Sequence, residues 1–276
     1  MPLHDLWLVP LGAAVGVLGT LVGVGGGFVL VPILLLLYPD TDPETITAMS
    51  LLVVCANAAS GSVAYARQRR IDYRSAAWFV AGTAPGAVAG ALVVGYVPRR
   101  TFDAVFAAAL VALGVALLLR REGGAIRDPL TGQGVVRRQI TDAQGQTFVY
   151  AFRLWQGVAI SAFVGFVSSL LGIGGGVVHV PVMATVLHFP VHIAAATSHL
   201  VLAFMGAEAS AVHFASGTLG WDEHLLKAAL IAAGAIPGAQ LGARLSRRIR
   251  GALMLRALAG ALILVGLRLG AKAAGG

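Results

Sequence analysis

The decapeptide GVGGGFVLVP at residues 23–32 recurs in the second half of the chain as GIGGGVVHVP at residues 172–181. A second pair follows in the same order, with GTAPGAVAGA at residues 82–91 and GAIPGAQLGA at residues 234–243. Two motifs that recur in the same order, each followed by similar hydropathy, indicate an internal duplication rather than chance similarity. The chain is therefore expected to fold as two related halves.

The composition around these motifs is that of a membrane protein. Of the 276 residues, 58% are hydrophobic and 12% are charged, whereas a soluble domain averages about 25% charged residues. The net charge of +8 comes from clusters of Lys and Arg that lie between long apolar runs, a pattern typical of cytoplasmic loops. Lipid is therefore the expected solvent, and the composition argues against a soluble domain and against a nucleic-acid-binding protein.

The lengths of the apolar runs predict the fold class. Most runs reach the ~20 residues that span a ~30 Å hydrocarbon core, but those at 28–38 and 177–188 are shorter, and each follows a glycine cluster. We predict an all-α polytopic membrane protein with two inverted repeats, each containing a glycine-broken short or re-entrant helix pair and three transmembrane helices. The first repeat is predicted at residues 1–119, a cytoplasmic linker at 120–153, and the second repeat at 154–276.

The positions of the basic residues decide between two topologies. If each broken segment enters and leaves on one side, the halves are inverted, and the basic clusters at 67–74, 120–153 and 244–256 all face the cytoplasm. If each broken segment is a single crossing, the halves are parallel and the cluster at 244–256 moves outside. The first arrangement satisfies the positive-inside rule better, so inverted repeats with both termini outside are expected.

The linker at 120–153 is polar, and its residues from Gln139 to Tyr150 alternate in polarity around Asp142. This pattern fits a short surface hairpin. A disordered loop explains the same composition equally well.

The glycine clusters are the candidate binding site. Glycine accepts positive φ and lets a ligand approach the backbone, and successive exposed N–H groups form an anion-binding nest. The helices that begin after each cluster would direct their positive N-terminal ends at the same place. Gly25, Gly26 and Gly27, with Gly174, Gly175 and Gly176, are therefore predicted to bind substrate. Close helix packing is the alternative, and it is the favoured explanation for Gly12, Gly16, Gly19 and Gly23.

Polar residues inside the apolar runs supply further candidates. Asn57, Ser50, Ser198 and His199 are predicted to assist anion binding, since they lie on matching helices of the two halves. Glu208 and His179 are candidates for proton coupling, because an ionisable group within a membrane span is a functional candidate by default. A neutral hydrogen bond to a neighbouring helix explains Glu208 equally well, and packing explains the histidines. No metal-spaced cluster of His and Cys occurs, and the single cysteine, Cys55, excludes an intrachain disulfide.

The paired motifs, GxGGG followed by Pro and GxxPGxxxGA, together with the chain length, resemble the sulfite exporter TauE/SafE family of bacterial membrane permeases. The resemblance covers nearly the whole chain, and its glycine motif falls on residues 23–32 and 172–181. It implies transport of small sulfur-containing anions such as sulfite, thiosulfate or sulfoacetate. The chain departs from the family pattern at His179, where an apolar residue is usual, and this leaves substrate and coupling open.

The expected function is therefore that of a secondary permease or exporter of small anions, multi-pass in the cell membrane, with no cofactor and no enzymatic activity. A passive anion channel is the first alternative. An intramembrane enzyme that uses Ser168 or Ser169 with His179, and a structural membrane protein, are weaker ones. The expected partners are a small anionic substrate and the lipid bilayer, with a homodimer as one candidate assembly and no nucleic acid.

Overall fold

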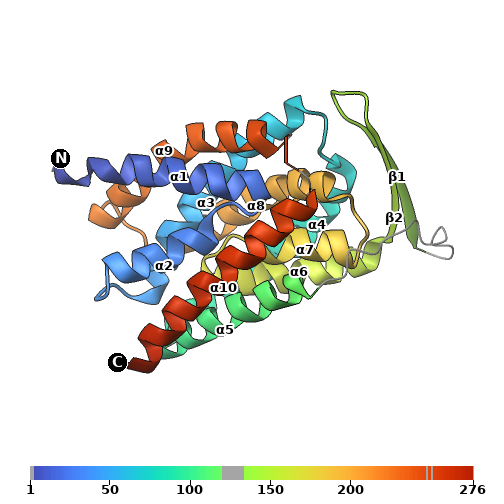
Figure 1. The fold of residues 1–276 in the computed structure, drawn as a ribbon. Coiled ribbons are helices and arrows are strands. Elements are labelled where there is room, and N and C mark those ends of the chain that lie inside the picture. The colour runs from blue at the N-terminus through green and yellow to red at the C-terminus, as the bar shows by residue number, and fades with distance from the viewer. Residues whose placement is uncertain (1–2, 120–133, 247, 250, 276) are drawn as a thin grey trace.

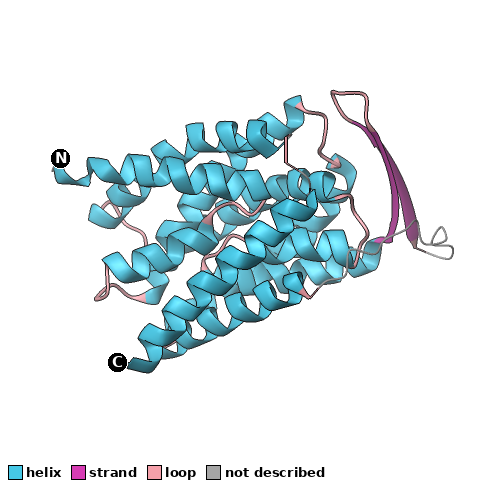
Figure 2. Ribbon diagram, viewed as in Figure 1, coloured by secondary structure: helices cyan, strands magenta, loops and turns pink. Residues whose placement is uncertain are grey.

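The computed structural model describes residues 3–119, 134–246, 248–249 and 251–275. Ten α-helices and one β-hairpin make up the described part of the chain (Figures 1 and 2). The first half contains η1 (Leu3–Trp7), α1 (Leu8–Val22), α2 (Gly27–Leu37), α3 (Pro43–Arg67), α4 (Tyr73–Val93), η2 (Val94–Tyr96) and α5 (Arg99–Leu118). The hairpin strands are β1 (Val135–Thr141) and β2 (Thr147–Arg153), and the second half contains α6 (Leu154–Leu171), α7 (Gly176–Thr185), α8 (Val191–Ala215), α9 (Glu223–Ser246) and α10 (Gly251–Gly275).

Helix lengths divide the bundle into long and short members. Seven helices of the described residues are long and apolar enough to cross a membrane, which confirms a polytopic membrane protein. By contrast, α2 has 11 residues and α7 has 10, about 15–17 Å of helix at 1.5 Å per residue. Both short helices start directly after a glycine cluster, as expected, because the chain breaks there.

The first long helix of each half packs against a helix of the other half, so the two halves exchange helices across the bundle. Helix α1 packs along α9, and its counterpart α6 packs along α4. The counterparts α3 and α8 pack against each other, as do α5 and α10 (Figure 1). Every major contact thus has an equivalent when the halves are interchanged, which is the contact pattern of a pseudo-twofold axis.

The second sequence motif builds the exchanged interfaces. On α4, Gly82, Gly86 and Gly90 lie against backbone atoms of α6, and on α9, Gly234, Gly238 and Gly242 lie against backbone atoms of α1. A methyl group on any of these glycines would collide with a main-chain atom of the facing helix. Membrane helices have no hydrophobic drive to associate, so close backbone approach at small residues supplies the packing energy. Gly12 and Gly16 on α1 meet α9 in the same way, which confirms their packing role.

Each broken helix pair begins and ends at one end of the bundle. Phe189, which follows α7, contacts Tyr150 of the hairpin with ring centroids 4.4 Å apart, and the hairpin leads into α6. At the opposite end, η1, which leads into α1, and the end of α2 line one cavity through Trp7 and Leu37. The two ends are separated by α8, whose 25 residues span about 37 Å. Both described chain ends lie away from the hairpin (Figure 1).

Of the two structures expected for the linker, a hairpin and a disordered loop, residues 135–153 form the hairpin. Residues 120–133 lie outside the part of the chain that the structure describes. Strands β1 and β2 pair antiparallel, from Val135 opposite Arg153 to Thr141 opposite Thr147. The tip is fixed to the α3–α4 loop, where the Ala143 amide donates to the Gln68 carbonyl at 2.9 Å. The hairpin therefore caps one end of the bundle as an ordered element.

A buried ion pair holds this tip in place. Arg70 donates to Asp142 Oδ2 through Nη2 at 2.8 Å, and both side chains are nearly inaccessible to solvent. Burial by itself would raise the pKa of Asp142, but the hydrogen bonds from Arg70 and from the amides of Gln146 and Gln144 outweigh it and hold that pKa below its ordinary value. Nearby, burial and then the adjacent Asp72 carboxylate raise the pKa of Tyr150, whose hydroxyl donates to Asp72 Oδ2 at 2.8 Å.

We predict that Asp142→Asn releases the hairpin tip. Removing one partner of a buried ion pair costs about 3–5 kcal/mol, because the remaining charge is left uncompensated. Hydrogen exchange of residues 135–153 should lose protection in this variant, while Asp222→Asn, in the loop at the far end, should leave it unchanged.

The Arg70–Asp142 ion pair also predicts how the attachment of the hairpin to the bundle depends on pH. A carboxyl group whose pKa is lowered by folding stabilises the folded state at pH values above its unfolded-state pKa of about 3.9. This contribution is lost as the pH falls through the folded-state pKa. Protection of the hairpin, corrected for intrinsic exchange, should therefore be equal at pH 7 and pH 5. Loss of protection already between those two values would contradict this account of the ion pair.

Candidate functional site

The two glycine breaks adopt the same backbone path. In the first break φ is positive at Gly23, Gly25 and Gly26, and in the second it is positive at the matching positions, 172, 174 and 175. The values range from 67° to 87°, a region that glycine enters without steric penalty. The duplication seen in the sequence is thus a duplication of backbone conformation, and it ends each first helix and starts each short one.

The two loops meet in the interior of the bundle. A methyl group on Gly27 would lie 2.7 Å from the carbonyl oxygens of Gly172 and Ile173, and one on Gly176 would lie 2.5 Å from Val24 Cα. These contacts are reciprocal, since each loop touches the other just before or at the start of its short helix. Residues 23–28 and 172–177 are all buried. The predicted meeting of the two breaks is therefore present.

Several backbone N–H groups in these loops lack a hydrogen-bond acceptor. The first four N–H groups of a helix have no intrahelical partner, and here no side chain replaces it, because neither Gly26 nor Gly175 at the N-cap carries one. Among the described residues, no acceptor is found for the amides of Gly26, Gly27 and Phe28 in the first loop, or of Gly174, Gly175 and Val177 in the second. Two sets of buried donors therefore lie at two adjoining helix N-termini.

Helix α3 holds both loops by their carbonyl groups. Ser50 donates through Oγ to the Gly172 carbonyl at 2.7 Å, and Asn57 donates through Nδ2 to the Gly25 carbonyl at 3.1 Å. These predicted residues contact opposite loops from one helix. Because they occupy carbonyl oxygens and not amides, they fix the loops and leave the N–H groups available.

A polar network extends from the first loop to α8. Asn57 accepts a hydrogen bond from Thr20 Oγ1 at 3.2 Å, and Thr20 Oγ1 lies 3.1 Å from Nε2 of His199. Tyr65 donates to the Thr20 carbonyl at 2.6 Å, and its ring meets the His199 ring edge-on. The structure therefore brings the predicted Asn57 and His199 together at the loop through Thr20, which the sequence analysis did not select.

Unpartnered hydroxyl groups mark further polar positions. The predicted Ser198 is fully buried and its Oγ has no hydrogen-bond partner in the described structure. Ser168 is in the same state, and its Oγ would lie 3.3 Å from a methyl group on Gly175. Sequence reasoning missed Ser168 as a binding residue. The repeat indicates its neighbour instead, because a hydroxyl residue stands three positions before each glycine motif, at Thr20 and Ser169.

The two proton-coupling candidates lie apart from this network. His179 Nε2 is 3.2 Å from Ser161 Oγ, and its ring packs edge-on against Phe79. The nucleophile–base pair required by the enzyme alternative is not formed, because His179 pairs with Ser161 and not with Ser168 or Ser169. Glu208, on α8, makes no hydrogen bond or ion pair with the described residues, and its Oε2 is buried.

Apolar side chains enclose the loops on the remaining sides. The Val54 Cγ1 methyl lies between Gly25 and Gly174, close to both. Leu202 covers Gly25, Val15 covers Gly26, and Met205 lies 3.3 Å from a methyl group on Gly175. In this conformation the loops are closely packed, and a ligand reaches the free amides only if these side chains move.

Two half-length helices whose N-termini adjoin inside a bundle of long apolar helices are an arrangement found in membrane transporters.

The chain belongs to the sulfite exporter TauE/SafE family, whose sequence model matches residues 8–269. It is 32% identical over 268 residues to the probable membrane transporter protein YunE of Bacillus subtilis, covering 95% of this chain and 96% of that protein. It is 26% identical over 197 residues to the probable membrane transporter protein MJ0441 of Methanocaldococcus jannaschii, covering 69% of this chain and 65% of that protein. No solved structure matches the chain. The protein is therefore a multi-pass membrane transporter.

We predict that Asn57→Ala and Thr20→Val each destabilise the protein in detergent. Each change leaves buried partners unsatisfied, at a cost of about 1–3 kcal/mol. Because the two residues share one hydrogen bond, their effects on the free energy of unfolding should not add in the double variant. Thermal unfolding of the four proteins gives the coupling energy, and strictly additive effects would show that the network does not operate.

Proposed function

We propose that the protein is a secondary transporter of small anions, which it holds on the backbone N–H groups of the paired glycine loops. The sulfur-containing oxyanions and organosulfonates, such as sulfite, thiosulfate and sulfoacetate, are the proposed substrate class, in line with the family to which the chain belongs. The observation that carries the proposal is the set of buried amides without acceptors at two adjoining helix N-termini.

The electrostatics of the loops favour an anion. Each helix N-terminus carries about half a positive charge from aligned peptide dipoles, and free N–H groups there form anion sites. Hydrogen bonds to a charged acceptor contribute about 1.5–3 kcal/mol each. An anion bound between the loops would therefore be stabilised without a neighbouring cation, assisted by the Ser168 and Ser198 hydroxyls.

The arrangement of the broken helices supports inverted repeats in the membrane. In this proposal α1 and α2 enter and return at one surface, while α6 and α7 enter and return at the other. The hairpin end, with its arginine clusters, faces the cytoplasm, and both chain termini face outward across the cell membrane. Rocking of one half against the other along the glycine-rich interfaces would alternate access to the loops.

The enclosure of the loops fits an occluded conformation. Val54 lies between Gly25 and Gly174, so it occupies space that a substrate would need. Outward rocking of α3 would withdraw Val54 and open the loops, while Ser50 and Asn57, on the same helix, would exchange their carbonyl partners. Proton coupling is assigned to Glu208 or His179, since His179 is buried and Glu208 is half-buried with an inaccessible Oε2.

Transport assays test the site directly. We predict that Gly26→Ala and Gly175→Ala reduce uptake of labelled sulfite, thiosulfate or sulfoacetate into proteoliposomes about tenfold or more. An alanine side chain is strained at this positive φ and crowds its neighbours, which shifts the loop amides away from the anion at about the cost of one charged hydrogen bond. Wild-type flux that saturates and responds to a proton gradient would distinguish a carrier from a passive channel.

The matched controls are Gly145→Ala and Gly217→Ala. These glycines also have positive φ, near 80°, but nothing lies within 4 Å of an added methyl group. An alanine at either position therefore introduces similar backbone strain without disturbing the glycine loops. Normal flux in both loop variants, or equal losses in loop and control variants, would exclude the proposed site.

Cysteine accessibility tests the topology. In a Cys55→Ser background, we predict that a cysteine at Trp221, fully exposed in the α8–α9 loop, reacts with a membrane-impermeant maleimide added to intact cells. A cysteine at Val149, exposed on the hairpin, should react only after the membrane is opened. Labelling of both positions in intact cells would contradict the inverted arrangement.

A further inference from the structure

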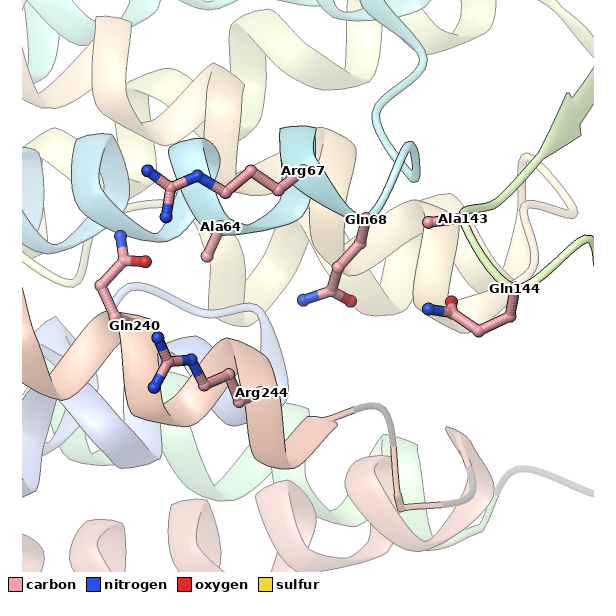
Figure 3. Close-up of a pocket in the computed structure, with 7 residues that line it drawn as sticks. All are labelled: Ala64, Arg67, Gln68, Ala143, Gln144, Gln240 and Arg244. Carbon is pink, nitrogen blue, oxygen red and sulfur yellow. The ribbon is translucent and has the colours of Figure 1, made fainter.

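A cavity of about 190 Å³ lies at the hairpin end of the bundle, remote from the glycine loops. Its walls come from α3, from α9 and from the tip of the hairpin (Figure 3). Since one water molecule takes about 30 Å³ of liquid volume, the space suits a small oxyanion with part of its hydration shell. The lining residues are Ala64, Arg67, Gln68, Ala143, Gln144, Gln240 and Arg244.

Two arginines give this cavity a positive charge. Arg67 extends from α3 and Arg244 from the facing α9 (Figure 3). Neither guanidinium has a carboxylate or other hydrogen-bond partner in the described part of the chain, and no acidic residue lines the space. By contrast, Arg70 and Arg99 are each paired with an aspartate.

Amide side chains fix the cavity walls. Gln240 donates to the Ser60 carbonyl at 2.6 Å and so joins α9 to α3. Gln68 donates to the Ala243 carbonyl at 2.9 Å, which makes a second link between the same helices. The two arginines are therefore presented from walls whose spacing is set by hydrogen bonds.

The hairpin forms the third wall of the cavity, which stays partly open to solvent. Ala143 and Gln144 line the cavity, and they are kept there by the hydrogen bond from the Ala143 amide to the Gln68 carbonyl and by the buried Arg70–Asp142 pair. The cavity thus contains one wall from each half of the chain and a third from the segment that joins them.

Three polar residues and one alanine of α3 lie on one face between this cavity and the first glycine loop. Asn57, Ser60, Ala64 and Arg67 follow helical spacing, and so they share one face of α3. Arg67 and Ala64 line the cavity, Ser60 bonds to Gln240, and Asn57 bonds to the first loop at Gly25. Ten residues of helix separate Arg67 from Asn57, about 15 Å.

The far end of the bundle has no equivalent of this charge. The cavity there is lined by Asp5 and Glu223 together with Lys227, among others. The pseudo-symmetry of the helices is therefore not matched by the charges at the two ends.

We propose that the hairpin-end cavity is a second anion site, which binds a small soluble oxyanion between Arg67 and Arg244 before it passes along α3 to the glycine loops. Planar guanidinium groups match the oxygens of sulfonate, sulfate and related anions with paired hydrogen bonds. Fixed positive charge in a cleft also raises the local concentration of anions. The role in transport rests on the proposed function, whereas the binding itself does not.

Equilibrium dialysis of the purified full-length protein against radiolabelled sulfate tests the site. Wild-type protein should bind sulfate, and the affinity should fall about tenfold in Arg67→Gln or Arg244→Gln and further in the double variant. Arg153→Gln, which removes an exposed arginine elsewhere on the hairpin, is the matched control and should bind normally. Equal affinity in the wild-type protein and the double variant would overturn the proposal.

Two further measurements separate this site from its alternatives. Anionic lipid headgroups share the same chemistry, so binding of phosphatidylglycerol in nanodiscs without any binding of sulfate would overturn the assignment to a soluble anion. The Gly26→Ala and Gly175→Ala variants should keep arginine-dependent sulfate binding, and loss of that binding would show that the two sites are one. Arginine-dependent binding in a protein without flux would refute the transport proposal alone.

Discussion

The fold depends on one constraint, which is that a polar backbone in lipid must satisfy its hydrogen bonds within the protein. The long helices meet it internally. The two glycine breaks do not meet it fully, since donors at the starts of α2 and α7 lack acceptors among the described residues. Such donors persist only because the surrounding helices bury and position them. A buried, unsatisfied donor costs about 1–3 kcal/mol, so the packing of the whole bundle must offset that cost at its centre.

Duplication supplies that packing. Because α1 lies on α9 and α6 on α4, neither half forms its own complete bundle, and the loops meet only when the halves interlock. The glycines of the second motif let the exchanged helices approach to backbone contact, so these interfaces depend on small residues at matching positions of the two halves.

The linker breaks the symmetry that the helices follow. Its hairpin covers one end of the bundle, is fixed there by the Arg70–Asp142 pair, and lines a cavity with two arginines that have no partner among the described residues. Two nearly equivalent halves can therefore present different electrostatic surfaces to the two sides of a membrane. Under the proposed function, the symmetric interior would bind the anion and the asymmetric hairpin end would collect it.

The sequence alone determined the class of the protein, the duplication, the two helix breaks and the packing role of Gly12 and Gly16, because composition, repeat spacing and glycine pattern act locally along the chain. It left the hairpin undecided, and it selected Asn57 and His199 without their link, Thr20. Only the tertiary structure showed that Ser50 and Asn57 hold opposite loops, that His179 pairs with Ser161, and that Val54 fills the space between the loops. The contacts of Ser50 with Gly172 and of Val54 with Gly174 join the two halves, and the others depend on how helices pack within one half. No local sequence pattern encodes either kind of contact.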